Sequence, residues 1–221
     1  MRLIIVVVSI ALLLVLASCA RFESQRCLFL SGTAKDNCYL EQHKCSKMEN
    51  VAFRDSCVAD LAKATKDISV CRLITTQQTK AYCQEQIAEL KNDSTVCPMI
   101  TDQYWMDNCH SNLAISNNEA TLCASITNGK QKENCYQSIA LETSNLELCP
   151  KLLPKQRETC YFTIAAHLND TTICRNLNMS LSQNACILKI AKQIRNQKMC
   201  QQITIAPVRE ICNKDFGVNS S

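Results

Sequence analysis

Two adjoining segments decide the fold: CRLITTQQTKAYCQEQIAELKNDSTV at residues 71–96 and CPMITDQYWMDNCHSNLAISNNEATL at residues 97–122. Each begins with a cysteine, has an isoleucine three positions later (Ile74 and Ile100) and a second cysteine twelve positions later (Cys83 and Cys109). Because both segments are 26 residues long and keep the same register, they are two copies of a tandem repeat, and such a period decides the fold before any single element does.

The repeat extends over most of the chain. From Cys45 onward the steps between cysteines alternate between 12 and 14 residues, with one step of 11. A large apolar residue and usually Ala stand four and five positions after the second cysteine, as in Ile87 and Ala88. Spacings of three and four place residues on one face of an α-helix, so each unit is predicted to hold two helices with one buried cysteine on each. We expect a first helix of about two turns and a second of about three.

Repeated polar residues mark the helix starts. Asp67, Asp93 and Asn145 stand four residues before the first cysteine, and Ser69 and Thr95 stand two before it. Both columns consist of good N-cap residues. Pro98 and Pro150 follow first cysteines directly, which is tolerable only in a first helical turn. The proline positions therefore favour a first helix that begins close to the cysteine, with its N-cap nearer the Ser/Thr column than the Asp/Asn column.

Composition supports an all-α chain outside the reducing cytosol. The 221 residues include 17 Cys but only 3 Gly and 4 Pro, which argues against a turn-dense β fold and favours a disulfide scaffold or a metal store. The formal charge of +4 is small and dispersed, so no nucleic-acid partner is expected.

The N-terminus resembles a bacterial-type lipoprotein signal. Residues 3–16 are apolar except Ser9, and Leu16, Ala17, Ser18 and Cys19 resemble a lipobox, in which the cysteine is acylated and the signal is cut before it. The resemblance implies a signal peptide at residues 1–18, a lipid on Cys19 and a tether through residue 26. The membrane is then a partner through that lipid; which membrane is left open, and Ala20 provides no Asp retention signal. An uncleaved N-terminal anchor is the alternative, and both interpretations place the rest of the chain outside the cytoplasm.

Sixteen cysteines remain after Cys19, an even number, as a fully paired framework requires. The two cysteines of one unit lie at matching depths on either side of the hairpin turn, whereas pairing across the 14-residue step leaves a height mismatch of roughly 6 to 9 Å. The predicted disulfides are Cys27–Cys38, Cys45–Cys57, Cys71–Cys83, Cys97–Cys109, Cys123–Cys135, Cys149–Cys160, Cys174–Cys186 and Cys200–Cys212.

The predicted fold is therefore an α-solenoid of short antiparallel helical hairpins with a 26-residue period and one disulfide inside each hairpin. Residues 27–44 form an N-terminal capping hairpin, because Cys38 and Cys45 are only 7 apart where 14 is expected. Residues 45–212 hold the repeats, and residues 213–221 form a tail. In design the chain from Cys27 to Cys212 resembles secreted Sel1-like repeat proteins, relatives of the tetratricopeptide class, and this implies a protein-binding scaffold.

The sequence contains no recognised catalytic or cofactor motif. No CxxC, GxSxG, HExxH, Walker-type or GxGxxG sequence occurs, the three histidines occupy three different repeat columns, and no paired carboxylates at fixed spacing were identified. No enzyme, metal site or cofactor is expected. His110 shares its column with Tyr39, Tyr136 and Tyr161, which indicates packing.

The candidate binding residues are Tyr104 and Trp105, near the turn of the unit from Cys97 to Cys109. Trp105 aligns with Phe53 and Val208, which favours a core position, while Tyr104 is expected to be exposed. Sequons begin at Asn92, Asn169, Asn178 and Asn219, the first two as by-products of the cap pattern. The predicted function is a lipid-anchored, extracytoplasmic module that binds or scaffolds a protein at the membrane. Alternatives are a cell-envelope hydrolase or enzyme modulator with a site in the solenoid groove, and a thiol-based metal or redox buffer.

Overall fold

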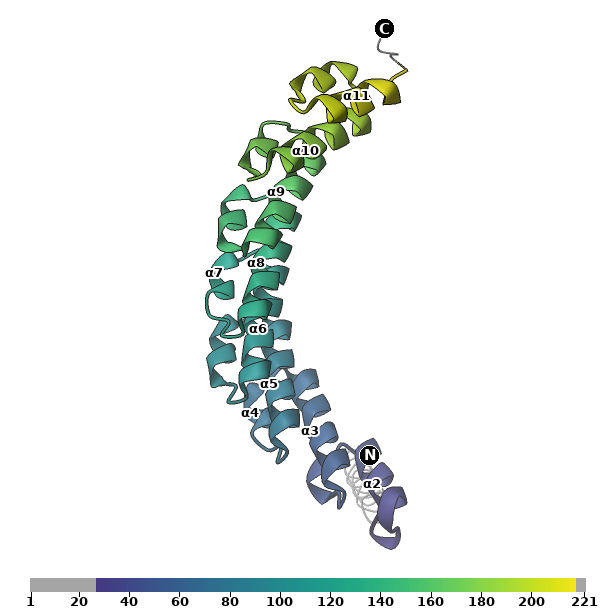
Figure 1. Ribbon diagram of the computed structural model, residues 1–221. Coiled ribbons are helices and arrows are strands. Elements are labelled where there is room, and N and C mark those ends of the chain that lie inside the picture. The colour runs from purple at the N-terminus through teal and green to yellow at the C-terminus, as the bar shows by residue number, and fades with distance from the viewer. Residues whose placement is uncertain (1–26, 218–221) are drawn as a thin grey trace, which may run out of the picture. The chain divides into compact units, whose positions relative to one another are not determined.

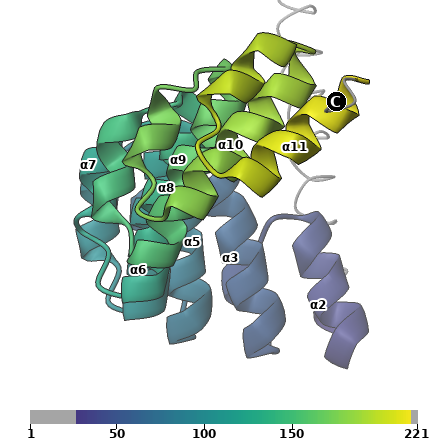
Figure 2. The ribbon, with the colours of Figure 1, turned by 45° about the horizontal axis from the view of Figure 1, so that its top comes forward.

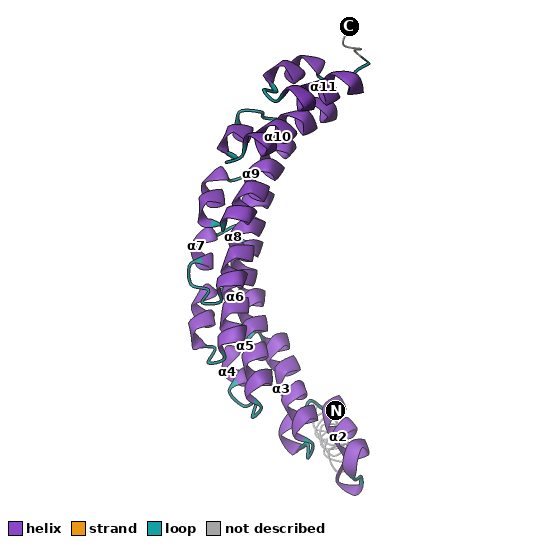
Figure 3. Cartoon of the chain, in the orientation of Figure 1, coloured by secondary structure: helices purple, strands orange, loops and turns teal. Residues whose placement is uncertain are grey.

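The computed structural model describes residues 27–217, which contain helices and loops and no strand (Figure 3). Residues 1–26 and 218–221, and with them the predicted signal and Cys19, lie outside the described part. The chain divides after Cys109 into two units, each built from hairpins that stack on their sequence neighbours. The predicted all-α solenoid of disulfide-stapled hairpins is confirmed.

The first unit starts with the short hairpin at the purple end of Figure 1, and α3 packs against both α4 and α5. Figure 2 shows α2, α3 and α5 side by side as the second helices of successive hairpins. Its elements are η1 (Cys27–Phe29), α2 (Gly32–Glu41), η2 (Cys45–Lys47), α3 (Val51–Thr65), α4 (Ile68–Cys71), α5 (Gln77–Lys91), η3 (Ser94–Met99) and the first half of α6 (Gln103–Ser116).

The second unit repeats the pattern, with α8 packed on α9, α9 on α10 and α10 on α11. Its last helix, α11, continues to Asp215, three residues into the segment assigned to the tail. Its elements after α6 are α7 (Ala120–Cys123), α8 (Gly129–Thr143), η4 (Leu146–Lys151), α9 (Pro154–Leu168), η5 (Ile173–Asn176), α10 (Ser180–Gln193), η6 (Gln197–Gln202) and α11 (Ala206–Asp215).

The first helix of each hairpin is mostly a 3-10 helix, and the second is longer than predicted. Each first helix closes with an i→i−3 hydrogen bond, as from the Ile100 N–H to the Cys97 carbonyl at 3.1 Å. Residues three apart eclipse one another in 3-10 geometry, so this turn directs the cysteine and the apolar residue to the same side. The full-length second helices have 14 or 15 residues, about four turns rather than three.

The core consists of the predicted columns. Ile87 and Ala88 of α5 are fully buried, and so are Ile190 and Ala191 of α10. Cysteines and the apolar residues three positions after them complete a narrow stripe of small and branched side chains. Because this stripe holds almost no aromatic area, each hairpin depends on its disulfide, which contributes about 3 kcal/mol for a loop of this length.

A left-handed residue ends most of the second helices. Lys66, Asn92, Asn118, Ser144 and Asn169 have φ between 52° and 55°. The N–H of the following residue then bonds to a carbonyl five residues back, as from Asp67 to Ala62 at 3.1 Å. This 6→1 bond is the Schellman motif, and it turns the chain back into the next hairpin.

Candidate functional site

The eight predicted intra-hairpin disulfides are all present, with Cα–Cα distances from 5.5 to 5.8 Å. Every cysteine of residues 27–217 is therefore oxidised, and the thiol-buffer alternative has no free thiol in this part of the chain. So many disulfides are consistent with an extracytoplasmic location.

The first helices α4, η3, η4 and η6 are capped from the Asp/Asn column and not from the Ser/Thr column that we predicted, whereas the N-cap residue of η5 is Thr172. Asp93 Oδ1 accepts the Thr95 N–H at 3.0 Å and also the Thr95 hydroxyl at 2.6 Å. The Thr therefore acts as a donor to the cap. The hydrogen bond from the hydroxyl, followed by the one from the backbone, lowers the pKa of Asp93. Asp67 and Asp170 repeat the arrangement with Ser69 and Thr172, and their pKa values are lowered for the same reason.

A second polar column, mostly acidic, joins several hairpins to the next one in the chain. In the first unit, the buried Asp36 carboxylate accepts backbone N–H groups of Glu49 and Asn50 at 2.8 and 3.0 Å. In the second unit, Glu133 accepts the Leu153 N–H at 3.0 Å and Glu158 accepts the Asn178 N–H at 2.9 Å. The donors lie at the start of the following second helix, where N–H groups have no partner in their own helix. This carboxylate clamp caps one hairpin from its predecessor.

The clamp lies two residues before each second cysteine, and the sequence interpretation missed it. One signal was available: the column contains an acid or Asn in every repeat except that of Ala81. Because acidic side chains on a helix usually lie on its solvent-exposed face, the sequence alone does not indicate that these residues are buried acceptors. The residues of this column that accept N–H groups of the next hairpin are Asp36, Asp55, Glu133, Glu158 and Asn184. In the same column, Asp107 accepts the side-chain amide of Gln103 in its own helix, and Glu210 of the last hairpin pairs with Lys214.

Three aromatic rings gather on the exposed surface of the first unit. Tyr82 of α5 and Tyr104 of α6 each contact Trp105 edge to face, with ring centroids 5.3 Å apart in both pairs. Tyr104 is 64% exposed, which confirms the prediction for this residue, and Tyr82 is 44% exposed. Trp105 is only partly buried, so its predicted core position is wrong: its repeat column lies at the rim of the helix, where Phe53 is also exposed.

The surface beside this aromatic group is polar. A small hollow of about 90 Å³ is lined by Ala59, Asp60, Lys63, Tyr82, Cys83, Gln86 and Ile87. A carboxylate, an ammonium group and an amide thus lie next to the Tyr82 ring. Aromatic rings next to hydrogen-bonding groups are the usual composition of a protein-binding hot spot.

One buried carboxyl of the first unit differs from the clamp residues. Glu85 of α5 is almost fully buried, and this burial, together with the negative charge of Glu89, raises its pKa to about 7. It therefore changes charge near neutral pH, whereas hydrogen bonds lower the pKa values of Asp55, Asp67 and Asp93.

The other predicted residues lie at separate places. His110 is buried, in agreement with its predicted packing role, while His43 and His167 are exposed. Asn92 and Asn169 occupy left-handed helix ends. The Asn178 N–H donates to the clamp, and Asn219 and Cys19 lie outside the described residues.

Within residues 27–217 no group of His, Cys, Asp and Glu side chains could hold a metal ion. The helices of this same part of the chain are all too short or too polar to cross a membrane. Comparison with protein-family models, curated proteins and solved structures finds no match for this chain.

Proposed function

We propose that this chain is a lipid-anchored, extracytoplasmic repeat module that binds a partner protein at the membrane surface. The lipobox-like sequence ending in Cys19 and the eight disulfides support the location. The stapled array supports a scaffold role, because it holds its exposed helices rigid without a large core.

The observation that carries the binding role is the aromatic group of Tyr82, Tyr104 and Trp105. Tyr and Trp dominate protein-binding hot spots, since each presents a large rigid ring with a polar end. Two consecutive second helices provide the rings, so the disulfides Cys71–Cys83 and Cys97–Cys109 fix the helices that carry them. The group is thus preorganised, which reduces the entropic cost of binding.

A photo-crosslinking experiment tests the binding role. The benzophenone amino acid p-benzoylphenylalanine replaces Tyr104 in the full chain, expressed in its own host, and the adduct is identified by mass spectrometry. The matched control carries it at Leu73, which is 67% exposed but outside the aromatic group. We expect one discrete adduct from position 104 and none from position 73. Equal labelling from both positions would contradict a binding site here.

A second variant checks that the aromatic group itself binds. Tyr82→Ser, combined with the crosslinker at the exposed Gln78, should lower the adduct yield about tenfold, as loss of a hot-spot side chain does. An unchanged yield would contradict the assignment.

The anchor is tested separately. Cys19→Ser should move the protein from the membrane pellet to the soluble fraction and abolish labelling by an alkyne analogue of palmitate. If the variant stays in the membrane without incorporating label, an uncleaved anchor replaces the lipid.

A further inference from the structure

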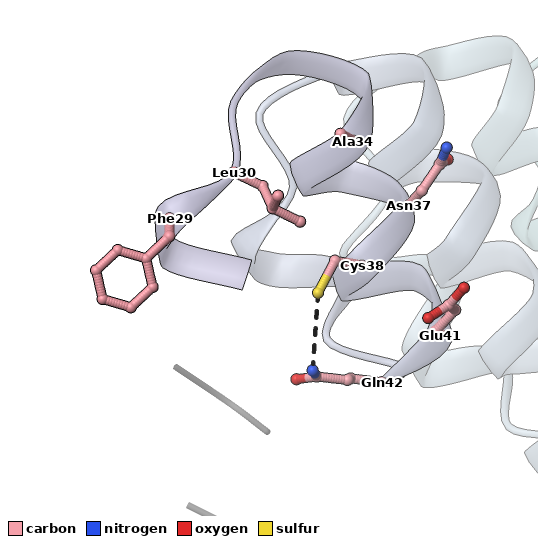
Figure 4. Close-up of a pocket in the computed structure, with 7 residues that line it drawn as sticks. All are labelled: Phe29, Leu30, Ala34, Asn37, Cys38, Glu41 and Gln42. Atoms are coloured by element: carbon pink, nitrogen blue, oxygen red, sulfur yellow. Dashed lines mark hydrogen bonds between the residues drawn. The ribbon is translucent and has the colours of Figure 1, made fainter. Parts of the chain in front are cut away.

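An uncovered hollow lies at the beginning of the first unit. It measures about 740 Å³ and is formed by η1 and α2 (Figure 4). Figure 4 shows Leu30 pointing into this hollow and Phe29 pointing away from the hairpin. The lining residues are Phe29, Leu30, Ala34, Asn37, Cys38, Glu41 and Gln42.

The repeat itself shows that this face is unusual. Leu30 occupies the column three residues after the first cysteine and is 41% exposed, whereas Met48, Ile74 and Ile100 in the same column of the unit are 4%, 1% and 0% exposed. Cys38 is also less buried than the second cysteines Cys57 and Cys83. In the later hairpins of this unit, the preceding hairpin helps to cover this face. Within the described residues, no hairpin precedes α2.

The end of the stack exposes apolar side chains, and Asn37, Glu41 and Gln42 also line its hollow. Phe29 is 89% exposed, and its neighbour Leu28 is 63% exposed. Terminal repeats of solenoid proteins ordinarily have a polar outer face, because nothing packs against them. A contiguous exposed apolar patch marks a surface that meets something else.

We propose that this end face, with Phe29 and Leu28 foremost, rests in the interfacial region of the lipid bilayer. The inference rests on the proposed lipid at Cys19 and deepens it, since it gives the protein an orientation. Cys19 lies eight residues before Cys27, so a fully extended tether spans at most about 29 Å. The lipid therefore confines the end face to the neighbourhood of the membrane surface. Phe and Leu side chains that enter the boundary between headgroups and acyl chains add buried apolar area to the contact that the lipid provides.

Depth-dependent fluorescence quenching tests this contact. The lipidated full-length protein carries Phe29→Trp in a Trp105→Phe background and is reconstituted on phosphatidylethanolamine/phosphatidylglycerol vesicles whose acyl chains are brominated near the headgroup. Ile211→Trp in the same background is the matched control, because Ile211 is 50% exposed on the last hairpin. We expect at least a twofold loss of emission from the tryptophan at position 29, with a blue shift, and no loss at position 211.

The outcomes separate this proposal from the anchor. If the protein floats with the vesicles and carries lipid by mass spectrometry, but quenching at position 29 equals that at position 211, the end-face contact is wrong and the anchor stands. If it carries no lipid, the anchor and the proposed contact both fail. If the tryptophan at position 29 is shielded from acrylamide but not quenched by brominated lipid, protein covers the face, either residues 20–26 or a second copy, and the bilayer assignment is overturned.

Discussion

Asp55 in α3 and Thr76 at the start of α5 are joined by a hydrogen bond of 2.7 Å, in which the Thr76 backbone N–H donates to the Asp55 carboxylate. The Thr75 N–H donates to the other oxygen of the same carboxylate at 3.2 Å. The second hairpin of the unit thus caps α5, the second helix of the third hairpin. Polar contacts as well as the apolar stripe therefore hold the stack together.

Removing this clamp should weaken the first unit strongly. Asp55→Ala leaves two N–H groups without their charged acceptor, and we expect a loss of about 2–3 kcal/mol in the free energy of unfolding. Asp55→Asn should cost about 1 kcal/mol, because Asn184 shows that an amide oxygen can accept the equivalent N–H of Thr204. Urea unfolding with intact disulfides measures both. The control is Asp60→Ala on the exposed face of α3, expected to change stability by less than about 0.5 kcal/mol; equal losses at positions 55 and 60 would contradict the clamp.

Acid should destabilise the fold through the same carboxylates. Burial alone would raise the pKa of Asp55, but the hydrogen bonds from Thr76 and Thr75 outweigh burial and lower it. A folded pKa below the unfolded value of about 3.9 means that the stabilisation is complete above that value and is lost as the pH falls through the folded pKa. Melting temperatures between pH 2 and 6 should therefore fall on the acid side of about pH 4. The slope should be shallower in Asp55→Asn, and an unchanged slope would assign acid sensitivity to other groups.

Glu85 should give the opposite dependence near neutrality. Its folded pKa of about 7 lies above the unfolded value, so the folded state binds the extra proton. Stability is then greatest below the unfolded pKa of about 4.3 and declines as the pH rises through 7, by on the order of 2–3 kcal/mol. Glu85→Gln should remove this decline and be more stable than the parent at pH 8. A parent whose melting temperature does not change between pH 5 and 8 would show that Glu85 has an ordinary pKa.

The left-handed helix ends offer a stabilising substitution. Lys66 has φ of 52°, a conformation in which a Cβ is strained and glycine is not. We expect Lys66→Gly to raise the free energy of unfolding by about 0.5–1 kcal/mol. Lys63→Gly in the same helix is the matched control, and it should lower stability by about 1 kcal/mol because its backbone is helical. The same sign for both substitutions would contradict strain at Lys66.

The sequence predicts the parts of this fold that depend on local spacing. The cysteine steps predict each disulfide, and the columns containing Ile87 and Ala88 predict the core, because both follow from helical periodicity. The clamp of Asp55 was missed because its donors lie twenty residues away and become neighbours only when hairpins stack. Trp105 was misplaced for a related reason, since aligning it with Phe53 identifies its column but not whether that column is buried.

One repeat lacks the clamp, and the helix that the clamp would cap has an acidic residue of its own at its start. Ala81 is buried where Asp55 and Asp107 stand in the flanking repeats. The second helix that it would cap is α6, which begins at Gln103. The residue before it, Asp102, itself accepts the N–H groups of Tyr104 and Trp105 at 3.0 and 3.2 Å. No other second helix has an acidic residue at this position. Restoring the clamp would therefore place two carboxylates at one helix start.

A double-mutant cycle tests this compensation. Ala81→Asp alone should be neutral or destabilising, because the new carboxylate faces the charge of Asp102. Asp102→Asn alone should cost about 0.5–1 kcal/mol, since a charged group at a helix N-terminus is replaced by a neutral one. The double variant has a carboxylate at position 81 and an uncharged residue at position 102, as the native chain has at Asp55 and Thr76. The double variant should thus be more stable than the sum of the single changes by about 1–2 kcal/mol in urea unfolding. Strict additivity would mean that the two positions do not meet.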